Sequence, residues 1–238
     1  EQSVHTTWDI SIEALRTRAP AAAELLVLCA LLAPDDTPLA MFTSIGPQTA
    51  GAACCPSLCE LLGAAADDDD RSDRLMEQLR AARSYSLIEW SSSESGVTMS
   101  MHRLVQDVQR RQLARESATW QNRVRLVASL LESAMPTVGD DATLEEAHAV
   151  GPLLAHVHSL LSTVASSPTP DMPTGLVPAQ LLDKAADARR RRGEYEMERV
   201  LRQALLQEER AEKGDEHLDT LGAMGNLACA LLAAGQNA

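Results

Sequence analysis

Apolar residues recur three or four positions apart along most of the chain, which is the spacing of one face of an α-helix. The first clear case is Leu25, Leu28 and Leu32, which follow Pro20 and precede Pro34. Proline suits the first turn of a helix and stops a helix that reaches it, so a helix is predicted between the two prolines. The same periodicity predicts helices over about 70–82, 102–115, 117–135, 144–150, 152–161, 195–212 and 217–233.

Two short segments alternate apolar and polar residues instead. Ser86–Trp90 and Val97–Met101 have the period of a β-strand, and the polar residues 91–96 between them predict a β-hairpin with a long tip. Helices followed by a hairpin and a further helix are typical of a winged helix. Residues 19–115 are therefore expected to form a winged-helix-like domain.

The remaining segments lack a clear period. Residues 1–18 are expected to be a polar lead-in from a preceding module, and residues 46–70 to be mostly loop, with a short helix around Leu58–Leu62. Residues 116–165 are expected to be a helical spacer. Residues 166–177 are interpreted as a linker and domain boundary, because they lie in a Ser/Thr-containing stretch with prolines at Pro168, Pro170, Pro173 and Pro178.

An internal repeat occupies the C-terminal part. Ala186 and Gly193 recur 42 residues later as Ala228 and Gly235, with two apolar-periodic helices between the glycines. Two helices per unit at such a period are the mark of an α-solenoid. Such arrays need at least about three units, and 178–238 holds fewer, so we expect the array to continue and the chain to be a piece of a longer protein.

The amino-acid composition excludes some functional classes for this chain. The chain has 238 residues, 34 acidic and 21 basic side chains, and a net charge of −13, which disfavours bulk binding to nucleic acid or anionic lipid. Aromatic residues are only 3%, in a sequence rich in Ala and Leu, which favours a mostly α fold over a β-sandwich.

The cysteines and the most apolar stretch indicate the cellular compartment in which the chain is expected. Five cysteines, an odd number, argue against a disulfide framework and favour a reduced, cytoplasmic setting. The stretch Ala19–Ala33 contains Glu24 and is too short to span a bilayer, so no membrane partner is expected.

The C-terminal residues resemble the tetratricopeptide repeats of the kinesin-light-chain type, which have a 42-residue unit and a Gly-x-x-His between helices. The resemblance implies an α-solenoid that binds protein partners on its surface. Met197 stands where the family places a small Ala, so helix contact there is expected to be looser. The residues that carry the match, in structural roles, are Gly193, Tyr195, Ala204, Leu205, Gly214, His217, Asn226, Leu227, Ala228 and Gly235.

The N-terminal half resembles the region after the nucleotide-binding module of NB-ARC (STAND) signalling NTPases. The match rests on Trp8–Ile12, Leu25–Ala30, Pro34–Leu39 and Met101–Gln106. In that family a His at the end of the winged helix contacts the β-phosphate of ADP, and the resemblance places this role on His102. The family usually has an Asp next, where this chain has Arg103, so the acidic latch does not carry over.

Together the two resemblances imply the regulatory and protein-interaction part of a nucleotide-switched signalling NTPase, with an upstream NTPase module in cis. The nearest string to a phosphate-binding loop, Gly46–Ala53, lacks its Lys and hydroxyl residue, so no enzymatic activity and no cofactor are expected here. ADP or ATP would bind the full-length parent. The alternatives are a repeat adaptor with no nucleotide role and, less favoured, a winged-helix DNA-binding regulator.

Other clusters of residues allow both a structural and a functional interpretation. Arg189–Arg192 fit a solvated helix end or an acidic-partner site, and residues 102–127, with a local balance of +4, fit a docking face or a DNA-binding face. Cys54, Cys55 and Cys59, the pair His156 and His158, and the acidic run Asp67–Asp70 lack the spacing of metal ligands, so neither a metal site nor a catalytic residue is proposed.

Overall fold

The computed structural model describes residues 2–53, 55–64, 67–93, 96–115, 117–139, 141–166 and 175–236, and within them it has thirteen helices and three strands. The mostly helical class with a small antiparallel sheet is therefore confirmed. The chain divides into two compact units. Unit 1 comprises residues 1–130 and 158–170, and unit 2 comprises residues 131–157 and 171–238.

Unit 1 begins with two consecutive helices, α1 (Gln2–Arg18) and α2 (Pro20–Cys29), which pack on each other. The expected lead-in is thus a helix over its described residues, 2–18. Its inner face carries Ile12 and Leu15, both buried, at a spacing of three residues. The helix α2 is buried on nearly all sides, which explains why its sequence is apolar except for Glu24.

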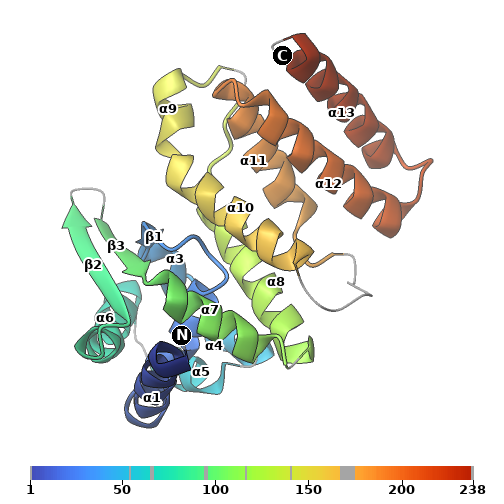
Figure 1. Cartoon of the computed structure of the whole chain (residues 1–238). Helices are drawn as coiled ribbons and strands as arrows, with labels where there is room; N and C mark the ends of the chain where they lie inside the picture. The colour runs from blue at the N-terminus through green and yellow to red at the C-terminus, as the bar shows by residue number, and fades with distance from the viewer. Residues whose placement is uncertain are drawn as a thin grey trace. The chain divides into compact units, whose positions relative to one another are not determined.

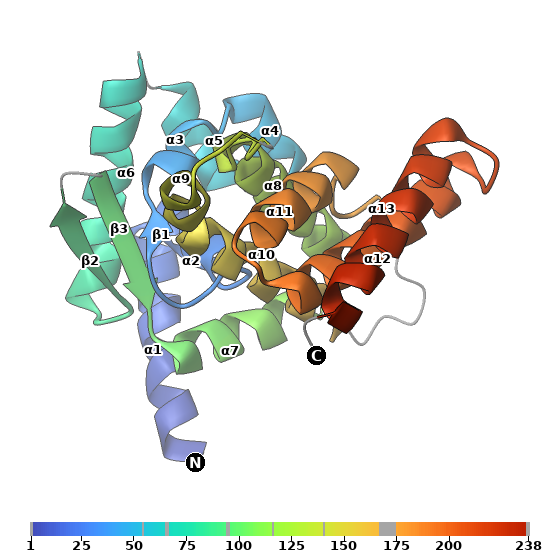
Figure 2. The same ribbon diagram turned by 90° about the horizontal axis from the view of Figure 1, so that it is seen from above.

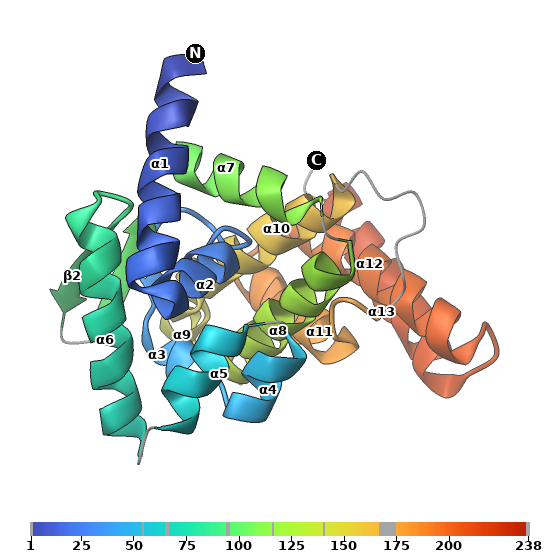
Figure 3. The ribbon, with the colours of Figure 1, turned by 90° about the horizontal axis from the view of Figure 1, so that it is seen from below.

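The short helix expected around Leu58–Leu62 is present, but most of the remaining described residues of segment 46–70 are helical too, so the prediction of a loop there is wrong. The segment contains α4 (Pro47–Ala52), α5 (Pro56–Gly63) and the start of α6 (Asp68–Ser84), preceded by the short α3 (Ala40–Thr43). Pro47 and Pro56 each occupy a first-turn position, where the missing N–H costs nothing. Figure 3 shows α4 and α5 side by side, and they pack closely. Such short helices are stable only because packing supports them.

The predicted hairpin is present, as β2 (Ile88–Ser93) and β3 (Gly96–Met101). They pair antiparallel, with Ile88 opposite Met101 and Trp90 opposite Met99. A third strand, β1 (Thr37–Pro38), pairs with the other edge of β3, as Figure 2 shows. Proline lacks the N–H of a central strand, and β1 is an edge strand, where it is tolerated.

Helix α7 (Arg103–Leu113) follows the sheet, and α8 (Ser117–Ala134), α9 (Leu144–Ala149) and α10 (Gly151–Ala165) come next. The division between the units falls within α8 and within α10, so the expected spacer 116–165 contributes to both. The chain breaks its helix at Val150, before Pro152, where a kink or a pair of helices was expected.

The last three helices of unit 2 pack in succession. They are α11 (Ala179–Arg191), α12 (Tyr195–Lys213) and α13 (Leu218–Gln236), and α12 lies between the other two (Figure 1). Most of the expected linker, residues 167–174, lies outside the described residues, whereas Leu176 and Val177 are buried.

Helix α13 is also the one described helix that is long and apolar enough to cross a membrane. Its segment Leu218–Gly235 has a mean hydropathy of 1.3, and 22% of it is buried in the protein. Length and composition alone are weak grounds for a membrane span.

Candidate functional site

His102 lies where the hairpin ends and α7 begins. It is the residue before the first turn of α7, and its Nδ1 accepts a hydrogen bond from the Leu104 N–H at 3.2 Å. The neutral ring therefore carries its proton on Nε2. The ring is exposed and stacks on Trp8, with centroids 5.7 Å apart and an angle of 22° between the planes. Capping of α7 thus accounts for the Nδ1 atom of His102, and stacking on Trp8 accounts for one face of its ring.

Gly193 closes α11 in a left-handed conformation, with φ of 72°. The Gly193 N–H donates to the carbonyl of Arg190 and the Glu194 N–H to the carbonyl of Arg189, each at 3.0 Å. This crossed pair is the Schellman motif, which favours glycine because a side chain is strained at that φ. The first predicted repeat glycine therefore has a clear local reason.

The turn between α12 and α13 is built from Gly214, His217 and Thr220. Gly214 has φ of 86°. His217 precedes α13 and accepts the Asp219 N–H on Nδ1 at 3.2 Å, as His102 does for α7. Thr220 is fully buried and donates to the Gly214 carbonyl at 2.8 Å. These contacts fix the hairpin of α12 and α13 without any ligand.

The other predicted repeat residues differ in burial. Leu205 is buried, and Tyr195, Ala204 and Leu227 are half-buried on α12 and α13. Asn226, Ala228 and Gly235 are exposed. Ala186, one period before Ala228, is completely buried. Besides Ala186, only Leu205 is buried among these predicted repeat residues, and those of α13 are more exposed than those of α12.

The arginine run at the end of α11 is used inside unit 2. Arg189 and Arg192 both pair with Glu194, and Arg192 also reaches the carbonyl of His148 at 3.4 Å. Arg189 donates to the carbonyl of Leu154 at 3.3 Å. Neither a solvated helix end nor an anion site describes these two arginines, because they bind the end of α9 and the start of α10.

The strongest charged cluster was not predicted. Arg202 is 4% exposed and donates to Asp183 and, at 2.5 Å, to Asp187, while the carboxylate of Glu198 lies 3.8 Å away. Burial raises the pKa of Glu198, although Arg202 and Arg190 attract its charge. The only sequence signal was the i, i+4 spacing of Glu198 and Arg202 on one helix face.

In the basic stretch 102–127, Arg110 is a structural residue. It donates to the carbonyls of Ala30, at 2.5 Å, and Leu32, at 3.2 Å, beyond the end of α2, and the buried Gln106 donates to the carbonyl of Cys29 at 3.3 Å. Burial lowers the pKa of Arg110. Cations and amides at a helix C-terminus satisfy its free carbonyls.

The described residues contain no group of three or more His, Cys, Asp and Glu that could hold a metal. Cys55 is buried and Cys59 half-buried, and Cys54 lies outside the described residues. Asp67 caps α6 by accepting the Asp70 N–H at 2.8 Å, so one member of the acidic run serves the helix start.

The comparisons with known proteins add no family. No protein-family model, no curated protein and no solved structure matches the chain.

Proposed function

We propose that the protein is a helical protein-interaction module whose α13 face binds a partner. The observation that carries the proposal is the set of large apolar residues exposed on this one helix. Between 50% and 81% of each side chain is accessible for Leu218, Leu221, Leu231 and Leu232.

The packing of α13 explains why these leucines face outward. The helix buries small residues against α12, namely Ala223, Ala230 and Ala234. Small residues let two helices approach closely. An ordinary amphipathic helix turns its large apolar side chains inward, so α13 has a second apolar face. Exposed large apolar side chains gathered on one helix are a mark of interaction sites.

The expected occupant is another helix with an apolar face. Helix α11, which contains Ala186, packs against both α9 and α12, and the 42-residue spacing of Ala186 and Ala228 predicts the same two-sided environment for α13. A further helical repeat in cis and a helical segment of a partner protein have the same chemistry. The tetratricopeptide resemblance points to the same use of the surface.

The experiment compares two matched variants. Leu221→Ser with Leu231→Ser removes the apolar face, and Leu104→Ser removes an exposed leucine on α7 as the control. A photo-crosslinker at Asn226 should capture the same partner with wild type and the control, and lose it with the double variant while the circular dichroism is unchanged.

Two results would contradict the proposal of partner binding through α13. An unchanged crosslinking pattern in the double variant refutes partner binding through this face. Flotation of the wild-type chain, but not of the double variant, with neutral phosphatidylcholine vesicles would assign the face to a membrane instead, consistent with the apolar length of α13.

A second candidate function is nucleotide reading by His102 within a signalling NTPase. It is favoured by the exposed ring of His102 and by its Nδ1 contact, which leaves the proton on Nε2 as a donor for a phosphate oxygen. In a longer chain that includes the nucleotide-binding module, His102→Ala should weaken ADP binding by about 5- to 150-fold, the worth of one hydrogen bond to a charged group.

The control for this second candidate is Arg103→Ala, which removes the neighbouring exposed charge without removing the donor. Calorimetric titration of ADP should show the loss for His102→Ala only. Equal affinities of wild type and His102→Ala would leave His102 as a helix cap and favour the adaptor function alone.

A further inference from the structure

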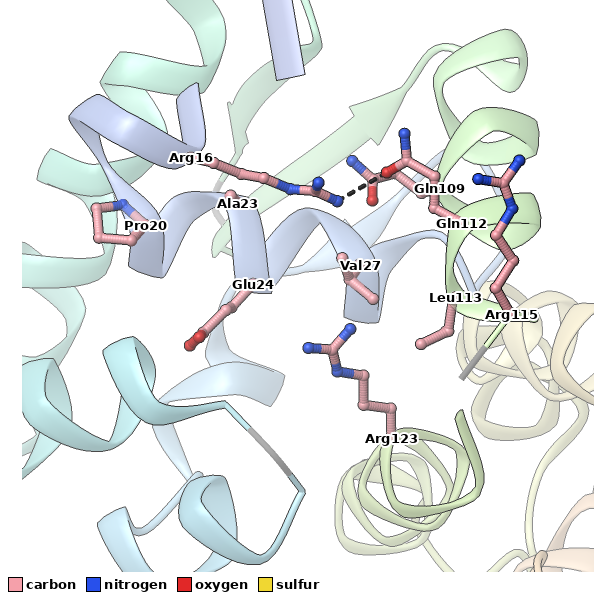
Figure 4. A pocket seen from close by; sticks show the side chains of 10 residues that line it. All are labelled: Arg16, Pro20, Ala23, Glu24, Val27, Gln109, Gln112, Leu113, Arg115 and Arg123. Atoms are coloured by element: carbon pink, nitrogen blue, oxygen red, sulfur yellow. Dashed lines mark hydrogen bonds between the residues drawn. The ribbon is translucent and has the colours of Figure 1, made fainter. Parts of the chain in front are cut away.

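Unit 1 contains a cavity of about 520 Å³ among α1, α2, α7 and α8. Figure 4 shows that Arg16 enters it from α1, Gln109 and Gln112 from α7, and Arg123 from α8, with Arg115 at one side. The rest of the lining is Pro20, Ala23, Glu24, Val27 and Leu113.

Basic side chains outnumber acidic ones in the lining of this cavity. Three guanidinium groups line it, in a chain whose net charge is −13. The only carboxylate among the described lining residues is Glu24, and it accepts the backbone N–H groups of Ser57, at 3.3 Å, and Leu58, at 2.8 Å, at the start of α5. Figure 4 shows Glu24 directed away from the arginines. An anion in the cavity would meet several cationic hydrogen-bond donors.

The side chain of Gln109 gives the second, independent observation. It is 1% exposed, and neither its amide nitrogen nor its amide oxygen has a hydrogen-bond partner in the described structure. A buried polar group without a partner costs about 1–3 kcal/mol. Figure 4 shows this amide beside that of Gln112, facing Arg16. A ligand that both accepts and donates would satisfy both of its atoms.

Arg16 is already oriented for binding. Its Nη2 donates to Gln112 Oε1 at 2.7 Å, and Gln112 in turn donates to Asp9 Oδ1 at 3.3 Å. Glu13 lies 3.6 Å from the same guanidinium but is largely exposed, so water screens that attraction. Positioning by a neighbouring amide lowers the ordering cost when a ligand binds.

We propose that this cavity binds a small phosphate monoester that carries hydroxyl groups. The phosphoryl group lies among Arg16, Arg115 and Arg123, because a dianion with three terminal oxygens matches several guanidinium forks better than a single carboxylate does. The organic part lies against Ala23, Val27 and Leu113, and a hydroxyl group bonds the amide of Gln109. The site is independent of the α13 face.

Calorimetric titration of the whole chain tests the proposal with three probes: inorganic phosphate, glucose 6-phosphate and glucose. Glucose 6-phosphate should bind more tightly than inorganic phosphate, and glucose should not bind. Arg123→Gln should weaken both phosphate ligands by about 10- to 150-fold, the range for a charge-assisted hydrogen bond.

Two further variants make the test specific. Arg125→Gln removes the same charge two residues along α8, from a side chain that bonds Asn122 and does not line this cavity, and it should bind as wild type does. Gln109→Met should reduce glucose 6-phosphate binding to the level of inorganic phosphate and leave inorganic phosphate unaffected. Thermal melting of each variant confirms that it folds.

Three results would overturn the proposal. The first is no saturable binding of either phosphate ligand. The second is an equal effect of Arg123→Gln and Arg125→Gln, which would mean general attraction by surface charge. The third is unchanged glucose 6-phosphate binding in Gln109→Met, which would make Gln109 a purely structural residue and leave an unspecific anion crevice.

Discussion

Replacing Arg202, a buried arginine of α12, by Met should strongly destabilise unit 2. Met keeps the length of the side chain but removes the cation that joins α12 to Asp183 and Asp187 of α11. Among the described residues, the variant would leave Asp187 and Glu198 only the more distant Arg190, which lies 3.7 Å and 4.0 Å from their carboxylates and is 43% exposed. Only 3% of the Glu198 side chain is exposed, so its charge has little access to water.

The magnitude follows from how buried each partner is. Breaking a fully buried ion pair by removing one partner costs about 3–5 kcal/mol. Asp183 is half exposed, with 50% of its side chain accessible, and water stabilises it in the variant. We therefore expect a loss of about 2–4 kcal/mol in the free energy of unfolding, most of it from Glu198.

The pH dependence gives a second readout with a fixed sign. Burial raises the pKa of Glu198 in the folded protein. A carboxyl group with a raised pKa favours the folded state below its unfolded pKa, and this contribution is lost as the pH rises through the folded pKa. Removing Arg202 raises the pKa of Glu198 further, so the deficit of the variant should shrink when the pH falls from about 7 to about 5.

Urea unfolding followed by far-ultraviolet circular dichroism measures the loss. Trp8, Trp90 and Trp120 all belong to unit 1, so their fluorescence follows that unit in the same samples. The matched control is Arg199→Met on the same helix, which breaks only the i, i+3 pair with Glu196 and should cost less than about 1 kcal/mol. Equal unfolding free energies for Arg202→Met and Arg199→Met would refute the reasoning.

Three further predictions concern single residues. Gly193→Ala should cost about 1–2 kcal/mol in thermal melts, because its φ of 72° strains any side chain although the nearest atom would be 4.0 Å from the new Cβ; an unchanged melting temperature would contradict this. Burial alone would raise the pKa of Glu194, but hydrogen bonds from Arg189 and Arg192 outweigh it and lower the pKa. Glu194→Gln should therefore destabilise unit 2 at pH 7, with a deficit that fades as the pH falls through the lowered pKa; a deficit that grows in acid would reverse the argument. Burial raises the pKa of Cys29 to about 12, whereas Cys229 is exposed. Maleimide labelling of the native protein with peptide mapping should find Cys229 modified well before Cys29, and the opposite order would count against the burial of α2.

The sequence by itself determined the elements whose signals are local. The apolar period located most of the long helices, although α1 was expected only as a lead-in, and alternation located the hairpin of β2 and β3. Gly193 was found from the 42-residue repeat and Gly214 from the tetratricopeptide resemblance, and the positive φ of both explains why glycine stands there. These features depend on a few neighbouring residues, so they can be recognised without knowledge of the fold.

The sequence failed where stability comes from distant residues. The helices α4 and α5 are too short to form alone. Burial of Leu58 and the carboxylate of Glu24, 34 residues earlier, supports α5 in the fold. The two-residue strand β1 likewise exists only because β3 offers it an edge.

Tertiary structure alone decided the role of the charged side chains. The sequence showed an arginine run and a basic stretch, and either could have faced water or a ligand. In the fold, Arg110 and Arg192 bind the ends of other helices, Arg202 joins α11 to α12, and Arg16 and Arg123 meet at one cavity. The physical reason is that a guanidinium group forms hydrogen bonds with any acceptor that lies within about 3 Å. The packing of the helices decides which acceptors lie so close, so the partner of an arginine cannot be read from its place in the chain.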